Sequence, residues 1–323
     1  MSTTFHLGAD ENGLGSRLGP LIVTAVLAET DASGERFLSR KLPKRMRDDL
    51  DDSKRLMSHT NVAVGEAWAR ALTGDSSRTP AELFERLSLE GTSTLRKPCP
   101  KSAGQQCWSE QGEAFAASSE QLARVAKHVQ TLAARGVRIL EVKSSVVCTG
   151  QLNENRARGI NRFVSDLHAM ERLLLDLRTR AGGPLHAVCG KVGGIGEYSK
   201  FFGPLAGWLH ATICEGQAES AYQFPKLGRV RFVRDADAHA PLVMLASLVG
   251  KYLRELFMSR IAGHYPGRDD PSLPRPSGYH DPITAAFVER TALVRKHRRM
   301  PDRCFERDRE PLGGALTEGV GTA

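Results

Sequence analysis

The chain has 323 residues, 41% of them hydrophobic, so it can bury a large core in one or two domains. Lysine and arginine total 45 against 37 for aspartate and glutamate, and the resulting net charge of +8 favours anionic partners such as nucleic acid. The most apolar stretch, residues 20–28, is far shorter than the roughly 20 residues of a membrane-spanning helix. The sequence therefore predicts no transmembrane helix.

The N-terminus and the cysteines bear on location. The first residues, MSTTFHLGADE, lack the basic and apolar regions of a signal peptide. The six cysteines include no CxxC pair, which disfavours a disulfide scaffold or a zinc ribbon and favours a reducing cytoplasm. Cys99 and Cys107 flank a loop with proline and lysine, and Cys148 could join them in a zinc site. Their spacing fits no standard zinc pattern, so we interpret them as free thiols.

In chain order, residues 4–11 and 21–28 are typical of two strands joined by a glycine-bearing turn that begins at Asn12. This hairpin places Asp10 and Glu11 at the end of its first strand. Periodicity indicates further elements. The helices are expected at 36–56, 60–72, 119–135, 157–181 and 241–261, and the strands at 137–147, 185–189 and 229–233.

The pattern breaks down at about 73–118, which is rich in Ser, Thr, Gly, Pro and Gln. We interpret this region as an insertion with one short helix near 80–90, within a domain spanning residues 1–290. Residues 291–323 are predicted to form a basic C-terminal tail. The order of the elements indicates one mixed α/β domain with a helical C-terminal part.

Carboxylates at predicted strand ends are the first candidates for chemistry. Asp10 and Glu11 end one strand, and Asp237 follows another. Clustered carboxylate oxygens hold Mg²⁺ or Mn²⁺ beside phosphate in phosphodiester-cleaving enzymes. Acidic residues are also common in turns and helix caps, so the spacing alone leaves both interpretations open.

The surrounding residues resemble those of a known family. GADENGLG at 8–15, followed by Gly19-Pro20, resembles the G-x-D-E-A-G-R-G opening motif of the type 2 ribonucleases H, the ribonuclease HII family. Four further blocks match in collinear order between residue 5 and about residue 290. They are DSKRL at 52–56, Ile160-Asn161 with Ala169-Met170, Asp237 with ASLVGK at 246–251, and GYHDP at 278–282.

The resemblance implies a ribonuclease H-like mixed sheet flanked by helices, with a C-terminal helical part. It also implies an endonuclease that uses Mg²⁺ or Mn²⁺ to cut RNA in RNA/DNA hybrids or at ribonucleotides embedded in DNA. The metal-binding and catalytic acids would be Asp10, Glu11 and Asp237. Substrate would contact Gly13 and Gly15 through a close backbone approach, Lys54 through a phosphate, and Tyr279 through the ribose.

Several positions depart from the family pattern, the mildest being Gly250 and Glu255, where Ala and Asp are usual. The family's fourth metal-binding acid falls here at Cys189 or Gly190, and neither is a carboxylate. Glu197 or Asp235 could take over that role. The arginine of the opening motif is replaced by Leu14.

The departures leave two hypotheses open. One is a divergent metal-dependent nuclease with weakened activity, and the other is a catalytically inactive protein that binds hybrid or structured nucleic acid. Either is expected to act as a monomer in the cytoplasm. The glycine-rich segment 190–196, GKVGGIG, lacks the phosphate-loop pattern, so a nucleotide triphosphatase is not expected.

Overall fold

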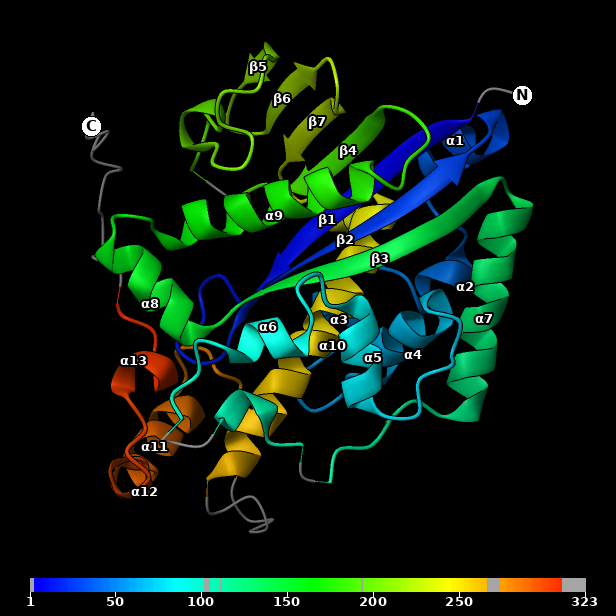
Figure 1. The fold of residues 1–323 in the computed structure, drawn as a ribbon. Coiled ribbons are helices and arrows are strands. Elements are labelled where there is room, and N and C mark those ends of the chain that lie inside the picture. The colour runs from blue at the N-terminus through cyan, green and yellow to red at the C-terminus, as the bar shows by residue number, and fades with distance from the viewer. Residues whose placement is uncertain (1–2, 102–104, 111, 193, 266–273, 310–323) are drawn as a thin grey trace.

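The computed structural model describes residues 3–101, 105–110, 112–192, 194–265 and 274–309. Within these ranges seven strands form a single mixed sheet, and helices cover both of its faces (Figure 1). The predicted α/β class is therefore confirmed, as is the mixed sheet flanked by helices. The insertion and the domain boundary at residue 290 remain predictions.

The strand order is β3-β2-β1-β4-β7-β6-β5. The first three strands, β1 (Thr4–Asn12), β2 (Leu21–Thr30) and β3 (Val137–Val147), pair antiparallel. Strand β4 (Leu185–Gly190) runs parallel to β1, and β7 (Gly228–Val233) runs parallel to β4. The carboxyl ends of β1, β4 and β7 consequently meet at one edge of the sheet, where ligand sites of α/β proteins are commonly built.

Two short antiparallel strands, β6 (Glu219–Phe224) and β5 (Ala211–Glu215), extend the sheet beyond β7. Neither was expected from the sequence. All five residues of β5 are exposed, so this edge strand has no buried face to create an alternating pattern.

Helix α10 (Pro241–His264) crosses the sheet in direct contact with the backbone of β1. A Cβ atom on Gly8 would lie 2.3 Å from the carbonyl carbon of Leu242, and one on Gly250 would lie 2.6 Å from Asn12 Nδ2. Only glycine fits at position 8, where the contact is with the backbone of α10, whereas a side chain at position 250 would have to displace those of Asn12 and Thr24. On the same face lie α4 (Ala63–Leu72), α5 (Pro80–Leu87) and α7 (Ser119–Ala134).

The opposite face is covered by α9 (Arg162–Arg178), which follows α8 (Thr149–Ala157). The helix predicted over 157–181 is present as α9, but it begins later and ends earlier than expected. Gly159 has a φ of +81°, which ends α8, and the side chain of Asn161 caps the start of α9 by accepting from the Val164 amide.

The expectation of one helix over 36–56 was wrong. This stretch contains parts of three short helices, α1 (Ala32–Leu38), α2 (Lys44–Arg47) and α3 (Ser53–Leu56). Pro43 precedes α2 and the side chain of Asp52 caps α3, so each begins anew. The stretch 73–118 holds α5, α6 (Thr92–Arg96) and the 3₁₀ turn η1 (Gln106–Trp108).

The C-terminal part folds onto the domain. Helices α11 (Pro282–Arg290), α12 (Ala292–His297) and α13 (Asp302–Phe305) build a small core with the end of α10. Leu18 from the β1–β2 connection is fully buried in that core. Residues 310–323 of the predicted tail lie outside the described residues.

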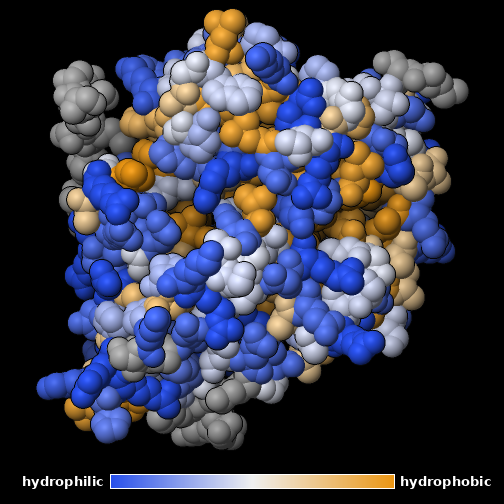
Figure 2. All heavy atoms as spheres, viewed as in Figure 1, coloured by the Kyte–Doolittle hydropathy of each residue, from blue (hydrophilic) through white to orange (hydrophobic). Residues whose placement is uncertain are grey.

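The face seen in Figure 2 is mostly hydrophilic, and hydrophobic residues gather at its upper end, over β5 to β7. Among the helices of the described ranges, none has both the length and the apolar character needed to cross a membrane.

One buried carboxylate fixes a loop against α9. The Oε2 atom of Glu171 accepts hydrogen bonds from the amides of Gly203 (3.0 Å) and Leu205 (2.8 Å), while its Oε1 atom is buried without a partner. Burial raises the pKa of Glu171 from 4.5 to about 7. A raised carboxyl pKa means that the folded state favours the protonated form.

We therefore predict that the Glu171→Gln variant becomes more stable relative to the wild type as pH rises. Below pH 4.5 both folded and unfolded chains carry a neutral side chain, so the two proteins should respond alike to pH there. Between about pH 4.5 and 7 the wild type should lose stability that the amide, which keeps the acceptor oxygen, retains. Denaturant unfolding at pH 4, 5.5 and 8 measures this, and a difference that does not change with pH would contradict it.

Candidate active site

A pocket of about 530 Å³ opens at the sheet edge where β1, β4 and β7 end. The five sequence blocks that resemble the ribonuclease HII motifs are spread from residue 8 to residue 282, yet four of them supply its lining. All seven residues predicted as catalytic or substrate-contacting border it: Asp10, Glu11, Gly13, Gly15, Lys54, Asp237 and Tyr279.

Asp10 and Glu11 lie near the carboxyl end of β1, where the strand passes from buried to half-buried positions. Asp10 is only 7% exposed and interacts with Ser247 of α10. Burial, followed by the charge of Glu11, holds the pKa of Asp10 well above its usual range. Burial and then Asp166 raise the pKa of Glu11 to about 8. Carboxylates crowded in this way are stabilised by protons or by a cation.

Asp237 reaches the same pocket from a turn after β7. Asp235 adopts a left-handed conformation, with a φ of +55°, which ends the strand and begins the 3₁₀ turn η3 (Ala236–Ala238). Aspartate tolerates this conformation better than most residues. Burial raises the pKa of Asp237, and the positive charge of Lys54 opposes the shift.

Asp166 is a fourth carboxyl group near this cluster that sequence reasoning missed. It lies on α9, is 1% exposed, and its Oδ1 atom has no hydrogen-bond partner. Burial and then the charge of Asp10 hold its pKa well above the usual range. Its position three residues after Phe163 and four before Met170, on the apolar face of the helix, was the available signal.

The two positions proposed for the missing acid face opposite sides of β4. Gly190 lines the pocket, and a Cβ atom there would lie 2.5 Å from Asp10 Oδ1 and 3.3 Å from Glu11 Oε2. Cys189 is fully buried in the core between the sheet and α9. The side chain of residue 190, not that of residue 189, therefore points at the carboxylates.

The two suggested substitutes for the missing acid are less well placed. Glu197 pairs with Lys200, and its side chain is half exposed. The side chain of Asp235 is 75% exposed and pairs with Arg234. Asp166, by contrast, is buried and its charge would act on both Asp10 and Glu11.

The glycine-bearing loop after β1 is held from behind by Arg307, which follows α13. This buried guanidinium donates to the carbonyl oxygens of Gly13 (2.6 Å), Leu14 (3.1 Å) and Gly19 (2.7 and 2.9 Å). Gly13 has a φ of +89°, and a side chain there would meet Arg254 Nε at 2.7 Å. No atom lies within 4 Å of where a Cβ atom of residue 15 would be. Because Gly15 has no side chain, the backbone of the loop is exposed to the pocket there.

Tyr279 lies on the opposite wall and is 44% exposed. The guanidinium of Arg254 lies 4.4 Å from the centre of its ring, and Arg254 Nη2 also donates to the carbonyl of Ser277 at 2.9 Å. Arg254 is 1% exposed, and its Nε has no hydrogen-bond partner. A cation stacked on one face of the ring positions the other face toward the pocket.

Lys54 projects from α3, and its amide donates to the capping side chain of Asp52. Helix α3 is itself fixed to α10, because Lys251 Nζ donates to the carbonyl oxygens of Ser53 (2.8 Å) and Met57 (2.7 Å). Lys251 is therefore a structural contact here, and Lys54 is the lysine whose charge acts on Glu11 and Asp237.

The donor set suits a hard divalent cation, because it consists of carboxylate oxygens that burial and mutual repulsion have crowded together. In the part of the chain that the structure describes, no three acidic, histidine or cysteine side chains are already close enough to hold one ion. Binding of one ion would require these side chains to move closer together.

Comparison with known proteins gave structural matches only. No family model and no curated protein matches the chain. The Mn²⁺ complex of Bst-RNase HIII matches 94% of this chain at 12% identity and a TM-score of 0.45, and this chain covers 66% of that protein. RNase HII from Archaeoglobus fulgidus, solved with PCNA, matches 96% of this chain and 97% of its own, at 19% identity and a TM-score of 0.41.

Ribonuclease H2 from Pyrococcus horikoshii OT3 matches 92% of this chain and 100% of its own length, at 13% identity and a TM-score of 0.41. The chain thus spans just under two thirds of the Bst protein and nearly all of the other two. At 12–19% identity these matches describe the fold and not the function of this chain.

The Arg307 contacts predict a specific loss of stability. Replacing Arg307 by lysine keeps the positive charge but cannot reach three carbonyl oxygens at once, so the free energy of unfolding should fall by about 2 kcal/mol. Arg309→Lys, at an exposed position nearby, is the matched control and should leave the free energy of unfolding unchanged. Guanidinium unfolding curves measure both, and equal values for the two variants would contradict the assigned role.

Proposed function

We propose that this protein is a metal-dependent endonuclease of the ribonuclease H type 2 kind, which cuts RNA in RNA/DNA hybrids or at ribonucleotides embedded in DNA. The observation that carries the proposal is the convergence of Asp10, Glu11 and Asp237 with Lys54 and Tyr279 on one pocket. Acids, a phosphate-binding cation and an exposed aromatic ring are the groups that this reaction needs together.

Asp10, Glu11 and Asp237 would hold Mg²⁺ or Mn²⁺, with Asp166 behind them. When bound, the metal would supply Lewis-acid stabilisation of charge at the scissile phosphate and lower the pKa of water. The chain's own part is to gather the carboxylates at the ends of β1 and β7 and to screen them from solvent. Lys54, whose charge already acts on Glu11 and Asp237, would bind a neighbouring phosphate.

The glycine-bearing loop would read the sugar through its backbone. The C=O and N–H groups on either side of a peptide bond point in opposite directions. Because the carbonyl groups of Gly13 and Leu14 bind Arg307, the amides of Leu14 and Gly15 point away from it and are available to a bound strand. The replacement of arginine by Leu14 leaves this recognition intact, and Tyr279 would pack against the ribose.

The test is cleavage of a DNA duplex that carries one ribonucleotide, in Mg²⁺ and in Mn²⁺. We expect strand scission at the ribonucleotide and a loss of at least about a hundredfold in the Asp10→Asn variant. Asp75→Asn, at an exposed turn away from the pocket, is the matched control and should cleave like the wild type. An all-DNA duplex should remain intact.

A second candidate is a protein that binds such duplexes without cutting them, and the absence of a carboxylate at Gly190 favours it. Tight binding with no cleavage in either metal would establish this alternative and refute the nuclease. Cleavage that persists in Asp10→Asn would instead point to a contaminating enzyme.

The position of Gly190 gives a further prediction. Gly190→Asp should raise cleavage by at least about tenfold, because the new carboxylate would face Asp10 and Glu11 once the Asp10 side chain has turned aside. Cys189→Asp is the matched comparison and should give no gain, since it would bury a carboxylate in the apolar core beside α9. Single-turnover rates measure both, and a gain from Cys189→Asp alone would reverse the assignment.

The monomeric state and the cytoplasmic location remain proposals. Both can be checked with the purified protein and with cell fractions.

A further inference from the structure

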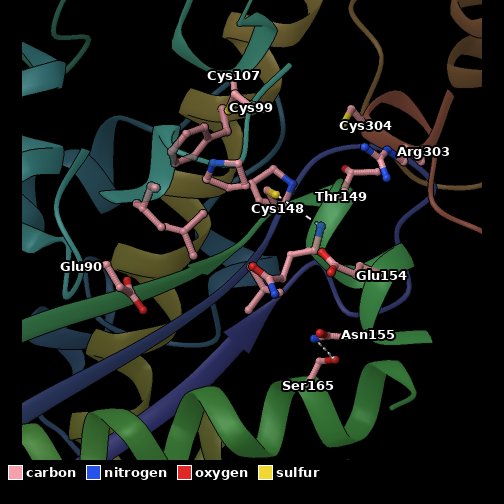
Figure 3. A pocket seen from close by; sticks show the side chains of 18 of the residues that line it. Glu90, Cys99, Cys107, Cys148, Thr149, Glu154, Asn155, Ser165, Arg303 and Cys304 are labelled. Carbon is pink, nitrogen blue, oxygen red and sulfur yellow. Dashed lines mark hydrogen bonds between the residues drawn. The ribbon is translucent and has the colours of Figure 1, made fainter. Parts of the chain in front are cut away.

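A second pocket, of about 520 Å³, shares no lining residue with the carboxylate pocket. Figure 3 shows that its walls come from segments far apart in the chain. Four of the six cysteines line it, one after α6, one in η1, one at the start of α8 and one in α13. They are Cys99, Cys107, Cys148 and Cys304, and we call this cavity the cysteine pocket.

The four thiols lie near one another. All four side chains border the same cavity of about 520 Å³, although they come from four separate segments. A Cβ atom on Gly150 would lie 3.3 Å from the sulfur of Cys304 and 3.9 Å from that of Cys148, so these two sulfurs border one point.

Buried polar contacts fix the segments that carry the thiols. Gln106, next to Cys107, is 4% exposed and donates from Nε2 to the carbonyl of Cys304 at 2.8 Å. Asn153 of α8 donates from Nδ2 to the carbonyl oxygens of Arg303 (2.9 Å) and Glu306 (2.8 Å). The cysteines are therefore brought together by specific docking of η1 and α8 onto α13.

Four converging thiols select soft metals, which in proteins means zinc or an iron–sulfur cluster. A single zinc ion needs its sulfurs about 2.3 Å from one point. Over the described ranges no three potential ligands are arranged to hold a single ion. A cluster places one cysteine on each of four iron atoms, which keeps the sulfurs farther apart and requires a cavity between them.

We propose that the cysteine pocket binds a four-iron, four-sulfur cluster. Each cysteine would bind as a thiolate, with its proton released to solvent. The spacing argument from sequence led to free thiols because it considered Cys99, Cys107 and Cys148 without Cys304, which only the folded chain brings to them.

The surroundings suit the negative charge of such a cluster. The sulfur of Cys148 accepts from the amide of Gln151 at 3.4 Å, at the positive end of α8. Trp108 Nε1 donates to the sulfur of Cys99 at 3.4 Å, a contact of the kind that tunes iron–sulfur centres. Arg172 and Arg303 also line the pocket, although Arg172 pairs with Glu90 at 3.4 Å.

The experiment uses the full chain, produced in iron-supplemented cells and purified without oxygen. We expect a brown protein with about four iron atoms and about four acid-labile sulfides per chain. The double variant Cys107→Ser/Cys148→Ser should keep less than about a tenth of this iron, whereas Cys214→Ser, at an exposed cysteine outside the pocket, should keep all of it.

The wild-type analysis decides the matter even if the double variant fails to fold. Colourless protein without iron or sulfide, after incubation with ferric iron, sulfide and a thiol reductant, would overturn the proposal. Zinc at one ion per chain without sulfide would also overturn it, as would iron retained in full by the folded double variant. None of these measurements depends on nuclease activity, so the proposed function can fail while this inference stands.

Discussion

The close approach of α10 to β1 is the constraint on which the rest of the structure depends. Backbone meets backbone at Gly8, and Gly250 lies against Asn12 two residues after Asp10. Because the helix is pressed so tightly to the strand, Ser247 reaches Asp10 and Lys251 reaches the carbonyl groups that hold α3. Without this contact neither Lys54 nor Asp10 would have a fixed position.

The acids at the sheet edge show how a fold can gather carboxyl groups that repel one another. Three neighbouring strands end together, and their topology gathers carboxyl groups that repel one another. Burial makes that repulsion costly, and protons relieve it in the absence of a cation. The same crowding that destabilises the fold locally is what would give the site its affinity for a divalent ion.

Asp166 extends this arrangement to the far side of β1. It interacts with Asp10 from a helix instead of a strand end. A carboxyl group that position 190 does not supply is thus present in the interior, on the side of the sheet that α9 covers.

Sequence reasoning predicted the hairpin of β1 and β2, the long helix α10 and the pocket-lining acids, because alternation and motif spacing are local properties. It failed where tertiary contacts decide. The helix predicted over 157–181 begins only at Arg162, after Gly159 and the Asn161 cap, and the exposed residues of β5 carry no alternation. Asp166 was hidden within the apolar face of a helix, and Cys304 could be joined to Cys107 only by the folded chain.

The guanidinium of Arg307 binds the carbonyl of Gly13 across 294 positions of sequence. During synthesis the hairpin emerges first, and the Arg307 guanidinium can bind its loop carbonyl groups only after residue 307 has left the ribosome. A nascent or truncated chain that lacks Arg307 would therefore contain Asp10 and Glu11, but its glycine-bearing loop would not yet be held in place. The order of translation itself would delay the completion of the site at which we propose that nucleic acid binds.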